Sequence, residues 1–418
     1  MKIAVWHNLR SGGGSRALHQ HIKGLAQRGH TIEVWTSSIA DSKFLDVDQY
    51  VAQTHILPLS MDIRIREEYK DKVWALQFEP ETRIRRMLDF CRQCADQINA
   101  GGFDVLFANS CIIFSMPYIG RFVNIPKALY LGEPNRTLFE SSPDLIWEGL
   151  PPANRNWKKS DYRHQYWDDI FRIRQARVRV REEIENYRNY DRVLVNSYFS
   201  NENLLRAYGG AGEVCYLGID SSLFPFHNLP REPFVMGLGA FFQHKRPDMA
   251  IESLALVPEA IRPKLVWVGD MGDKAYVEKL RKLSQEANVQ FEPREKIPHQ
   301  ELVRLLNTAS CLLYTSTLEP FGLAPLEANA CGLPVVAVAE GGVRETVIDN
   351  YNGLLVNRKP AEMAQAVERV LTDQALADRL SRNARRVVQE QWTFEKSIDR
   401  IEDALWQTIG KERKVVVR

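Results

Sequence analysis

Short apolar runs alternate with amphipathic stretches along the first half of the chain. The first apolar run is followed by Arg16–Arg28, an amphipathic stretch that ends before Gly29. This pattern predicts a helix, because glycine commonly follows the last helical residue. The runs that predict buried strands are Lys2–His7, Thr31–Trp35, Asp104–Ala108, Lys127–Leu131 and Arg192–Val195. Strands that alternate with helices in this way predict an α/β domain with a parallel, doubly wound sheet.

The second half repeats the alternation. Its predicted strands are Phe234–Gly239, Leu265–Val268, Val289–Phe291, Leu312–Thr315 and Val335–Val338. The closing helices are Ala361–Leu371 and Gln374–Gln389, followed by an amphipathic segment, Ile398–Ile409. A chain of 418 residues is long enough for two or three domains, so this half predicts a second α/β domain.

One stretch of the second half, Glu319–Pro334, contains the strongest candidates for ligand-binding residues. The apolar run Cys311–Ser316 before it predicts a strand, and Pro325 suits the first position of a following helix. Gly332 and Pro334 would end that helix. Glu319 then lies in a strand-to-helix loop and Glu327 in the first helical turn, at the sheet edge where open α/β sheets bind ligands.

Backbone N–H groups around Phe321, Gly322 and Leu323, at the positive end of this helix, predict a seat for phosphate. The carboxylates of Glu319 and Glu327 would repel phosphate, but they suit sugar hydroxyls, which donate hydrogen bonds to them. The combination favours a nucleotide-sugar site. The alternative is that Glu327 only complements the helix dipole and Glu319 only caps a loop.

The motif Glu319-Pro-Phe-Gly-Leu-Ala-Pro-Leu-Glu327, continued by Ala-Asn-Ala-Cys-Gly-Leu-Pro-Val-Val-Ala, resembles the Glu-x7-Glu signature of retaining glycosyltransferases of family 4, and the resemblance covers nearly the whole chain. It implies the GT-B fold, two Rossmann-like doubly wound domains that face a central cleft. Residues 1–197 would form the N-terminal acceptor-side domain, with the C-terminal helix 394–418 crossing back onto it. Residues 198–393 would form the nucleotide-sugar donor domain, in which Glu319 holds the transferred sugar and Glu327 the ribose.

A run of three glycines, Gly12, Gly13 and Gly14, follows the first predicted strand. It is neither a dinucleotide-binding fingerprint nor a P-loop, and by itself it indicates a flexible turn. Three glycines also let a backbone approach a ligand closely. The family resemblance implies that this loop faces the donor diphosphate.

Two positions depart from the family pattern. In the family, a Gly-Arg and a later lysine hold the two phosphates; Lys245 matches the lysine, but Ala240 follows Gly239, so Arg246 is the candidate substitute. Without the resemblance, this loop would be interpreted as solvated and charged.

The second departure is Gly132, where many members have a histidine near the reacting sugar carbon. Either Glu133, with Arg136 close by, contributes to the sugar or acceptor side, or this subgroup of the family does without the histidine side chain.

Composition narrows the classes of function. Formal net charge is only +2, from 55 basic and 53 acidic residues, which argues against a nucleic-acid binder. No apolar run approaches the roughly 18 residues of a membrane span, and the start is too short and too polar for a signal peptide. Six scattered cysteines fit reduced thiols and a cytoplasmic protein. Cys91 and Cys94 form a C-x-x-C within Ile84–Ile98, where a zinc or redox role is disfavoured for lack of further ligands.

The segment Trp157–Tyr190 interleaves basic and aromatic residues, and its apolar positions Ile170, Ile173, Val180, Ile184 and Tyr187 predict a helix with one apolar seam. It could meet an anionic acceptor or an anionic membrane surface, or it could be a solvated helix pinned by that seam. Asp46-Val47-Asp48 has the Asp-x-Asp form of metal-dependent transferases, but it lies in a polar stretch far in sequence from Glu319, and we interpret it as coincidental.

These observations predict a retaining, Leloir-type hexosyltransferase that uses a UDP- or GDP-linked sugar and a glycan, lipid-linked or small-molecule acceptor. No cofactor and no metal are expected. The resemblance implies front-face attack, in which the departing phosphate takes the acceptor's proton. The expected location is the cytoplasm, with peripheral contact to the inner face of the membrane as an option. Two alternatives stay open: a nucleotide-sugar epimerase of similar fold, and an inactive nucleotide-sugar-binding protein, which Ala240 and Gly132 motivate.

Overall fold

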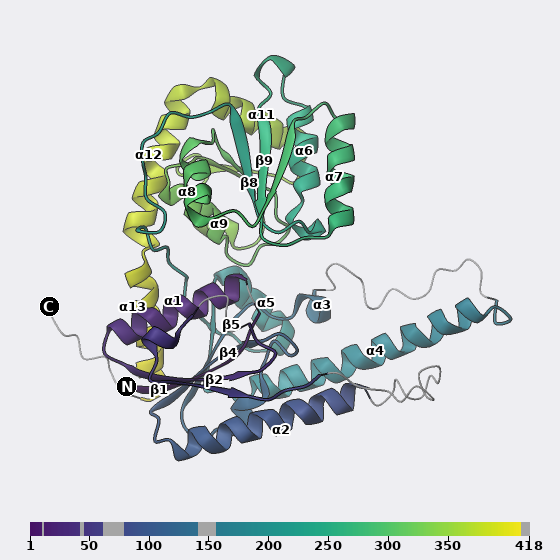
Figure 1. The fold of residues 1–418 in the computed structure, drawn as a ribbon, viewed down its shortest axis with the longest axis vertical. Helices are drawn as coiled ribbons and strands as arrows, with labels where there is room; N and C mark the ends of the chain where they lie inside the picture. Colours follow the sequence, from purple (N-terminus) through teal and green to yellow (C-terminus); the bar gives the residue numbers. More distant parts are fainter. Residues whose placement is uncertain (11, 42–45, 62–78, 141–155, 411–418) are drawn as a thin grey trace. The chain divides into compact units, whose positions relative to one another are not determined.

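The computed structural model describes residues 1–418 apart from 11, 42–45, 62–78, 141–155 and 411–418. The chain divides into two compact units, which are described separately (Figure 1). Unit 1 comprises Met1–Asn196, Asn201–Cys215 and Ile398–Arg418, and unit 2 comprises Ser197–Ser200 and Tyr216–Ser397.

Unit 1 is built on a seven-stranded parallel sheet in the order β3-β2-β1-β4-β5-β6-β7. Its strands are β1 (Lys2–Asn8), β2 (Thr31–Ser37), β3 (Gln53–Leu57), β4 (Val105–Cys111), β5 (Lys127–Gly132), β6 (Arg192–Val195) and β7 (Glu213–Val214). Its helices are α1 (Gly13–Gln27), α2 (Glu79–Ala100), α3 (Arg136–Phe139), α4 (Ser160–Tyr187), α5 (Tyr198–Tyr208) and α13 (Phe394–Thr408), the last two shared with unit 2. Helix α1 lies on one face of the sheet, and α2 and α4 lie on the other (Figure 1).

Unit 2 contains a six-stranded parallel sheet in the order β10-β9-β8-β11-β12-β13. Its strands are β8 (Phe234–Leu238), β9 (Lys264–Gly269), β10 (Phe291–Glu295), β11 (Leu312–Tyr314), β12 (Val335–Val338) and β13 (Gly353–Val356). Its helices are α6 (Pro247–Ala255), α7 (Lys274–Glu286), α8 (His299–Thr308), α9 (Leu323–Ala330), α10 (Val343–Thr346), α11 (Pro360–Thr372) and α12 (Gln374–Gln391). Helices α6 and α7 cover one face, and α8 and α9 the other (Figure 1).

The two doubly wound parallel sheets confirm the predicted α/β class. The predicted strand Val289–Phe291 is displaced, because β10 begins only at Phe291 and continues through polar residues. Strand β10 is the edge of its sheet and contains Pro293, which an edge strand tolerates. The edge strands β3 and β13 were not predicted. Strand β3 begins with polar residues and is half-exposed, so it lacks the apolar run on which the sequence prediction depends; β13 is apolar but only four residues long.

The core of unit 1 explains the C-x-x-C pair. Cys91 and Cys94 are fully buried on α2 and pack in one cluster with Trp6 and Trp35 of the central strands. Burial raises the pKa of the Cys94 thiol to about 12, so it stays protonated and cannot act as a ready metal ligand or nucleophile. All six cysteines are buried and free.

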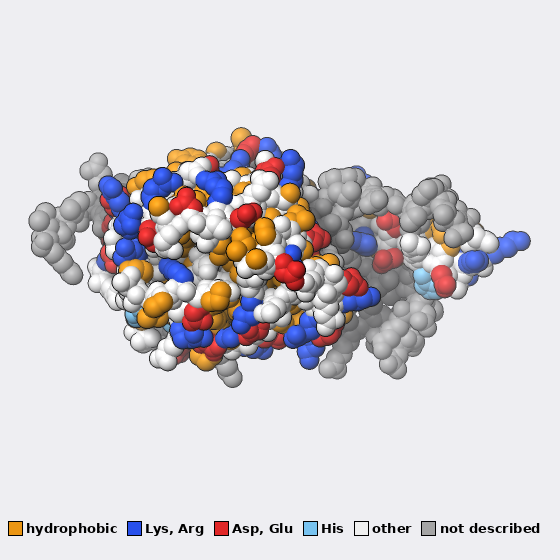
Figure 2. Space-filling model, turned by 90° about the horizontal axis from the view of Figure 1, so that it is seen from above, with side chains coloured by type: hydrophobic (Ala, Val, Ile, Leu, Met, Phe, Trp, Pro, Cys, Tyr) orange, Lys and Arg blue, Asp and Glu red, His pale blue; other side chains and the backbone are white. Residues whose placement is uncertain are grey.

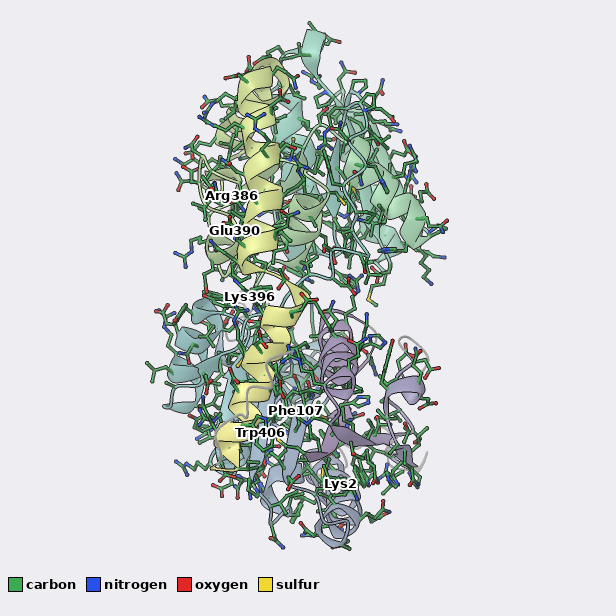
Figure 3. All side chains as sticks on the ribbon, turned by 90° about the vertical axis from the view of Figure 1, so that its left-hand side faces the viewer. Lys2, Phe107, Arg386, Glu390, Lys396 and Trp406 are labelled. Atoms are coloured by element: carbon green, nitrogen blue, oxygen red, sulfur yellow. The ribbon has the colours of Figure 1, made fainter. Side chains whose placement is uncertain are left out.

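The helical segment at the C-terminus packs within unit 1 through α13. A Cβ added to Gly24 of α1 would lie 2.3 Å from the Ile398 side chain, so the two helices meet closely at this glycine. Glu402 accepts hydrogen bonds from Arg28 at 2.6 Å and pairs with His30 at 2.9 Å. Figure 3 labels Trp406 on α13, and Arg386 and Glu390 on α12. The end of the predicted crossing helix, residues 411–418, lies outside the described residues.

Segment 157–190 forms the long helix α4, in agreement with the helical prediction. The predicted apolar seam is wrong for its first half, because Ile170 and Ile173 are 37% and 38% exposed. The second half is anchored by Glu183, a buried carboxylate that accepts hydrogen bonds from the N–H groups of Ser115 and Met116, both at 2.8 Å.

Charge of both signs is interspersed over the surface seen in Figure 2, as the small net charge requires. In the described part of the chain, no helix combines the length and the apolar character needed to cross a bilayer.

We predict that Glu183→Ala destabilises unit 1 by about 2–4 kcal/mol, because it leaves two N–H groups without their acceptor. Urea unfolding would measure the loss, and Glu185→Ala, an exposed position on the same helix, should change stability by less than about 0.5 kcal/mol. Burial raises the pKa of Glu183 from 4.5 to about 7, so the stabilisation from its protonated form is complete below pH 4.5 and is lost as pH rises through 7. An equal loss in both variants would contradict the anchoring role.

Candidate active site

The strand order of unit 2 reverses between β8 and β11, which lie side by side at the centre of the sheet. Their carboxyl ends lead into two loops, 239–246 and 315–322. Open α/β sheets bind ligands at such a reversal because the two loops diverge there and leave the sheet edge accessible. The site is therefore built from what these loops carry.

A close ion pair joins the two loops. Lys245, in the 3-10 turn Gln243–Lys245, places its Nζ 2.6 Å from Oε2 of Glu319. Both side chains are about four-fifths buried, at 18% and 21% exposed. The loops are also joined through their backbones, because Thr315 Oγ1 donates to the carbonyl of Lys245 and the N–H of Thr317 donates to that of His244, both at 2.8 Å.

A pair of glycines supports the backbone of the Glu319 loop. The N–H of Gly342 donates to the carbonyl of Glu319 at 2.8 Å. A Cβ at Gly342 would lie 2.1 Å from the carbonyl oxygen of Pro320, and Gly341 has a φ of +62°. A larger residue at either position would displace the loop, so these glycines help to position Glu319.

Helix α9 begins earlier than the sequence predicted. Gly322 is its N-cap in the left-handed region, with φ +101°, and Leu323 is its first residue, so Pro325 is third rather than first. Glycine adopts this left-handed conformation without strain, so the chain can turn sharply into the helix at Gly322. Glu327 consequently lies in the second turn, and it is buried, only 5% exposed. It is therefore not the helix-end charge that the dipole alternative requires.

The amides at this helix start could bind an anion, as the sequence predicts. The first N–H groups of a helix have no intrahelical acceptor, and the helix dipole adds positive potential there. Because Pro325 has no N–H, the seat consists of the amides that precede it, among them those of Phe321, Gly322 and Leu323. The helix ends as predicted at Gly332, whose N–H donates to Asn329 at 3.0 Å while that of Leu333 donates to Ala328 at 2.9 Å.

Tyr314, at the end of β11, was missed from the sequence because its apolar surroundings indicated only a core residue. It is buried, and burial raises its pKa well above the ordinary value; the Glu319 and Glu327 carboxylates raise it further. Its hydroxyl thus stays protonated near both acids of the Glu-x7-Glu motif.

The two arginines near Lys245, Arg246 and Arg358, already form contacts with carboxylate side chains. Arg246 has a φ of +53° and its Nε lies 2.9 Å from the Asp248 carboxylate. Arg358, which follows the unpredicted strand β13, donates to Thr317 Oγ1 at 2.6 Å and pairs with Glu340. Burial lowers the pKa of Arg358, and nearby Arg246 lowers it further, so two guanidinium groups lie near the loop that carries Glu319.

The other predicted site residues belong to unit 1. Gly13 and Gly14 lie in the first turn of α1 rather than in a loop, and Gly12 is its N-cap. No protein atom lies within 4 Å of a Cβ added at Gly12 or Gly13, so packing does not require glycine there. Arg136 lies between two carboxylates, 3.4 Å from Glu133 and 3.1 Å from Glu140.

The structure therefore brings together, in unit 2, most of the predicted donor-side residues: Lys245, Arg246, Glu319, Phe321, Gly322, Leu323 and Glu327. The glycines and the Glu133–Arg136 pair lie in unit 1.

Comparison with known proteins agrees with this architecture. Residues 221–387 match the family model described as glycosyl transferases group 1. A D-inositol 3-phosphate glycosyltransferase of Thermomonospora curvata is 31% identical over 238 residues, which are 50% of this chain and 55% of that protein. An alpha-1,3/1,6-mannosyltransferase, ALG2 of Dictyostelium discoideum, is 34% identical over 137 residues, 31% of this chain and 33% of that protein. The chain thus matches about half the length, or less, of these curated relatives.

Solved structures extend the likeness to the whole fold. HepE of Anabaena in complex with UDP-glucose superposes with a TM-score of 0.70 at 17% identity, over 97% of this chain and 100% of that one. Sucrose-phosphate synthase of Thermosynechococcus elongatus gives 0.69 at 21% identity, over 98% and 100%. Residues 221–387 of unit 2 are thus similar to the group 1 glycosyl transferases, and the fold of the chain is that of the GT-B glycosyltransferases.

Proposed function

We propose that this protein is a retaining glycosyltransferase that moves a hexose from a nucleotide diphosphate sugar to an acceptor hydroxyl. The observation that supports it most is the Lys245–Glu319 pair beside the start of α9, at the strand-order reversal of unit 2. The UDP-glucose bound by HepE favours a UDP-linked donor over a GDP-linked one.

In the ligand-free chain the Lys245 ammonium is neutralised by Glu319. A diphosphate seated on the α9 amides would compete for that ammonium, since charge-assisted bonds to phosphate are strong. Glu319 would then turn its oxygens to the hydroxyls of the sugar. The pair would thus exchange one internal contact for two contacts with the donor, one for each partner.

Retention of configuration is commonly achieved by a carboxylate nucleophile. Glu319 is poorly suited to that role in this scheme, because its oxygens would accept hydrogen bonds from the sugar hydroxyls once Lys245 has moved to the diphosphate. Front-face attack fits better: the leaving phosphate takes the acceptor's proton, and Lys245 and the amides stabilise the developing diphosphate charge.

Glu327 would hold the ribose. Its carboxylate could accept hydrogen bonds from the ribose hydroxyls.

The acceptor is a glycan, a lipid-linked saccharide or a small molecule, with Glu133 and Arg136 on the acceptor side. Reduced, buried cysteines fit a cytoplasmic chain. The exposed Trp157 and Trp167 by α4, among basic residues, keep contact with an anionic membrane surface as a proposal.

A second candidate is a nucleotide-sugar-binding protein without turnover. Ala240 favours it, because Arg246, the substitute for the missing arginine, already contacts Asp248. Tight UDP-sugar binding without product on any acceptor would distinguish this candidate, and product formed without acceptor would indicate an epimerase.

The donor contacts are tested by calorimetric titration with UDP and with uridine. Lys245→Met should weaken UDP binding by about tenfold or more, the value of one charge-assisted hydrogen bond, and leave uridine binding unchanged. Glu319→Gln should lower turnover while UDP affinity is kept or increased, because Lys245 loses its competing partner. Lys279→Met, at an exposed site on α7, is the control. Equal losses for UDP and uridine in Lys245→Met would show that Lys245 only supports its loop.

The glycine run is tested by Gly13→Ala. Alanine in a helical turn with no neighbour should stabilise the protein by about 0.5–1 kcal/mol. If the donor diphosphate approaches this backbone, the same variant should bind UDP-sugar several-fold more weakly. Increased stability with unchanged donor affinity would leave only the flexible-turn interpretation.

Transfer should need no divalent metal, because Lys245 and the α9 amides supply fixed positive charge where the phosphate departs. Activity assayed with excess chelator should match activity with added magnesium. Loss of transfer in chelator and its recovery with magnesium or manganese would overturn this electrostatic scheme.

A further inference from the structure

A four-residue segment of unit 2, Ser197–Ser200, lies within the sequence of unit 1. The chain up to Asn196 belongs to unit 1, and so does the stretch Asn201–Cys215. The segment follows β6 and includes the first turn of α5. It groups with unit 2 because it contacts α10 and the loop that carries Glu319, as the following contacts show.

Ser197 binds the backbone beside Glu319. Its Oγ donates to the carbonyl of Pro320 at 2.5 Å and accepts from the N–H of Ser200 at 2.9 Å, and the residue is fully buried. The hydroxyl therefore caps α5 at its third N–H group and also fixes the loop one residue after the acid. A helix cap requires only the bond that the hydroxyl accepts, so the bond to Pro320 serves the loop.

Glu345 of α10 binds the first two N–H groups of α5. Its carboxylate accepts from the N–H groups of Tyr198 and Phe199 at 2.9 and 3.0 Å, and from the hydroxyl of Tyr216 at 2.7 Å. The first N–H groups of a helix have no intrahelical acceptor. Here the side chains of Glu345 and Ser197 bind the first three, so this helix start is closed by the protein itself.

Helix α10 also supports Glu319. It follows Gly342, whose N–H donates to the carbonyl of Glu319 at 2.8 Å. The carbonyls of two consecutive residues, Glu319 and Pro320, are therefore bound by Gly342 and Ser197. Glu345 connects these two supports, because it lies three residues after Gly342 and binds the turn that begins at Ser197. The contacts thus form a closed ring that includes the backbone of the acid.

The next residue of the motif is anchored by packing. Phe321 is 3% exposed, and the centroid of its ring lies 6.0 Å from that of Tyr216 and 5.6 Å from that of Trp392. Tyr216 is also the residue whose hydroxyl binds Glu345. The side chain of Phe321 therefore belongs to the same group of contacts.

The backbone before the acid is strained. Leu318 has a φ of +46°, in the left-handed region that a bulky side chain rarely adopts. Conformations of this kind persist only where the surrounding structure holds them, and they are frequent at ligand-binding sites. When a support is removed, the loop can relax, and the direction of the Glu319 carboxylate changes with it.

We propose that Ser197 and Glu345 are positioning residues for Glu319, which hold its backbone so that its carboxylate meets the sugar of the donor. The part of this proposal that concerns transfer rests on the proposed function, whereas the support of the loop does not. Neither residue needs to contact the donor. A misplacement of about 1 Å in an active site can cost about a hundredfold in rate, so small shifts of this loop matter.

Hydrogen–deuterium exchange of the full chain, without ligand, tests the support of the loop. Ser197→Ala and Glu345→Gln should each speed exchange in residues 317–323 and leave exchange in strand β9 unchanged. Glutamine keeps the size of the side chain but offers one acceptor oxygen in place of two.

Each variant has a matched control. Ser310→Ala also removes a hydroxyl that donates to a backbone carbonyl, that of Glu232 at 2.8 Å, but it lies before β11 rather than after it. Glu202→Gln makes the same substitution as Glu345→Gln at an exposed position of α5. Neither control should change exchange in residues 317–323.

Transfer assays and UDP titrations test the role in turnover. Both variants should lower kcat by about tenfold or more, because the acid is misplaced, and should leave UDP affinity unchanged, because Lys245 is untouched. Unchanged exchange in residues 317–323, a kcat equal to that of the wild type, or equal losses of kcat and UDP affinity would each overturn the proposal. If the wild-type chain transfers no sugar, the proposed function fails, and exchange alone still decides whether Ser197 and Glu345 hold the loop.

Discussion

A largely buried ammonium needs a negative partner, and in unit 2 the pairing of Lys245 with Glu319 connects the two loops at the strand-order reversal. Lys245 and Glu319 come from loops after β8 and β11, 74 residues apart in the chain. Removal of either partner leaves a charge that is screened only in part by solvent, so each side chain fixes the other. The backbone bonds from Thr315 and Thr317 and the support of Gly342 then hold the acid close to the start of α9. These contacts thus hold the two loops together at the strand-order reversal.

The same ion pair explains how one site could bind both a negatively charged diphosphate and the hydroxyls of a sugar. The diphosphate of a nucleotide sugar needs cations and amides, whereas the sugar needs acceptors for its hydroxyls. An ion pair that opens when the donor binds provides both, because neither charge is buried without a partner at any stage.

The central strands could be predicted from the sequence because fully buried parallel strands are continuous apolar runs, as in Val335–Val338. Edge strands such as β3 lack that signal. The start of α9 was misplaced because Pro325 is a familiar helix start, whereas the left-handed Gly322 that sets the true start is visible only in the backbone. Contacts between distant segments, such as that of Arg358 with Thr317 and the position of Tyr314 near both acids, depend on tertiary packing, and no local pattern reveals them.

The central claim is that Lys245 and Glu319 form a donor site whose ion pair opens on binding. A crystal structure of the full chain with UDP tests it most directly. The account predicts Lys245 Nζ within hydrogen-bond distance of a phosphate oxygen, Glu319 released from its contact with Nζ, and the ribose hydroxyls on Glu327. An intact Lys245–Glu319 pair, with UDP bound elsewhere in the chain, would contradict it.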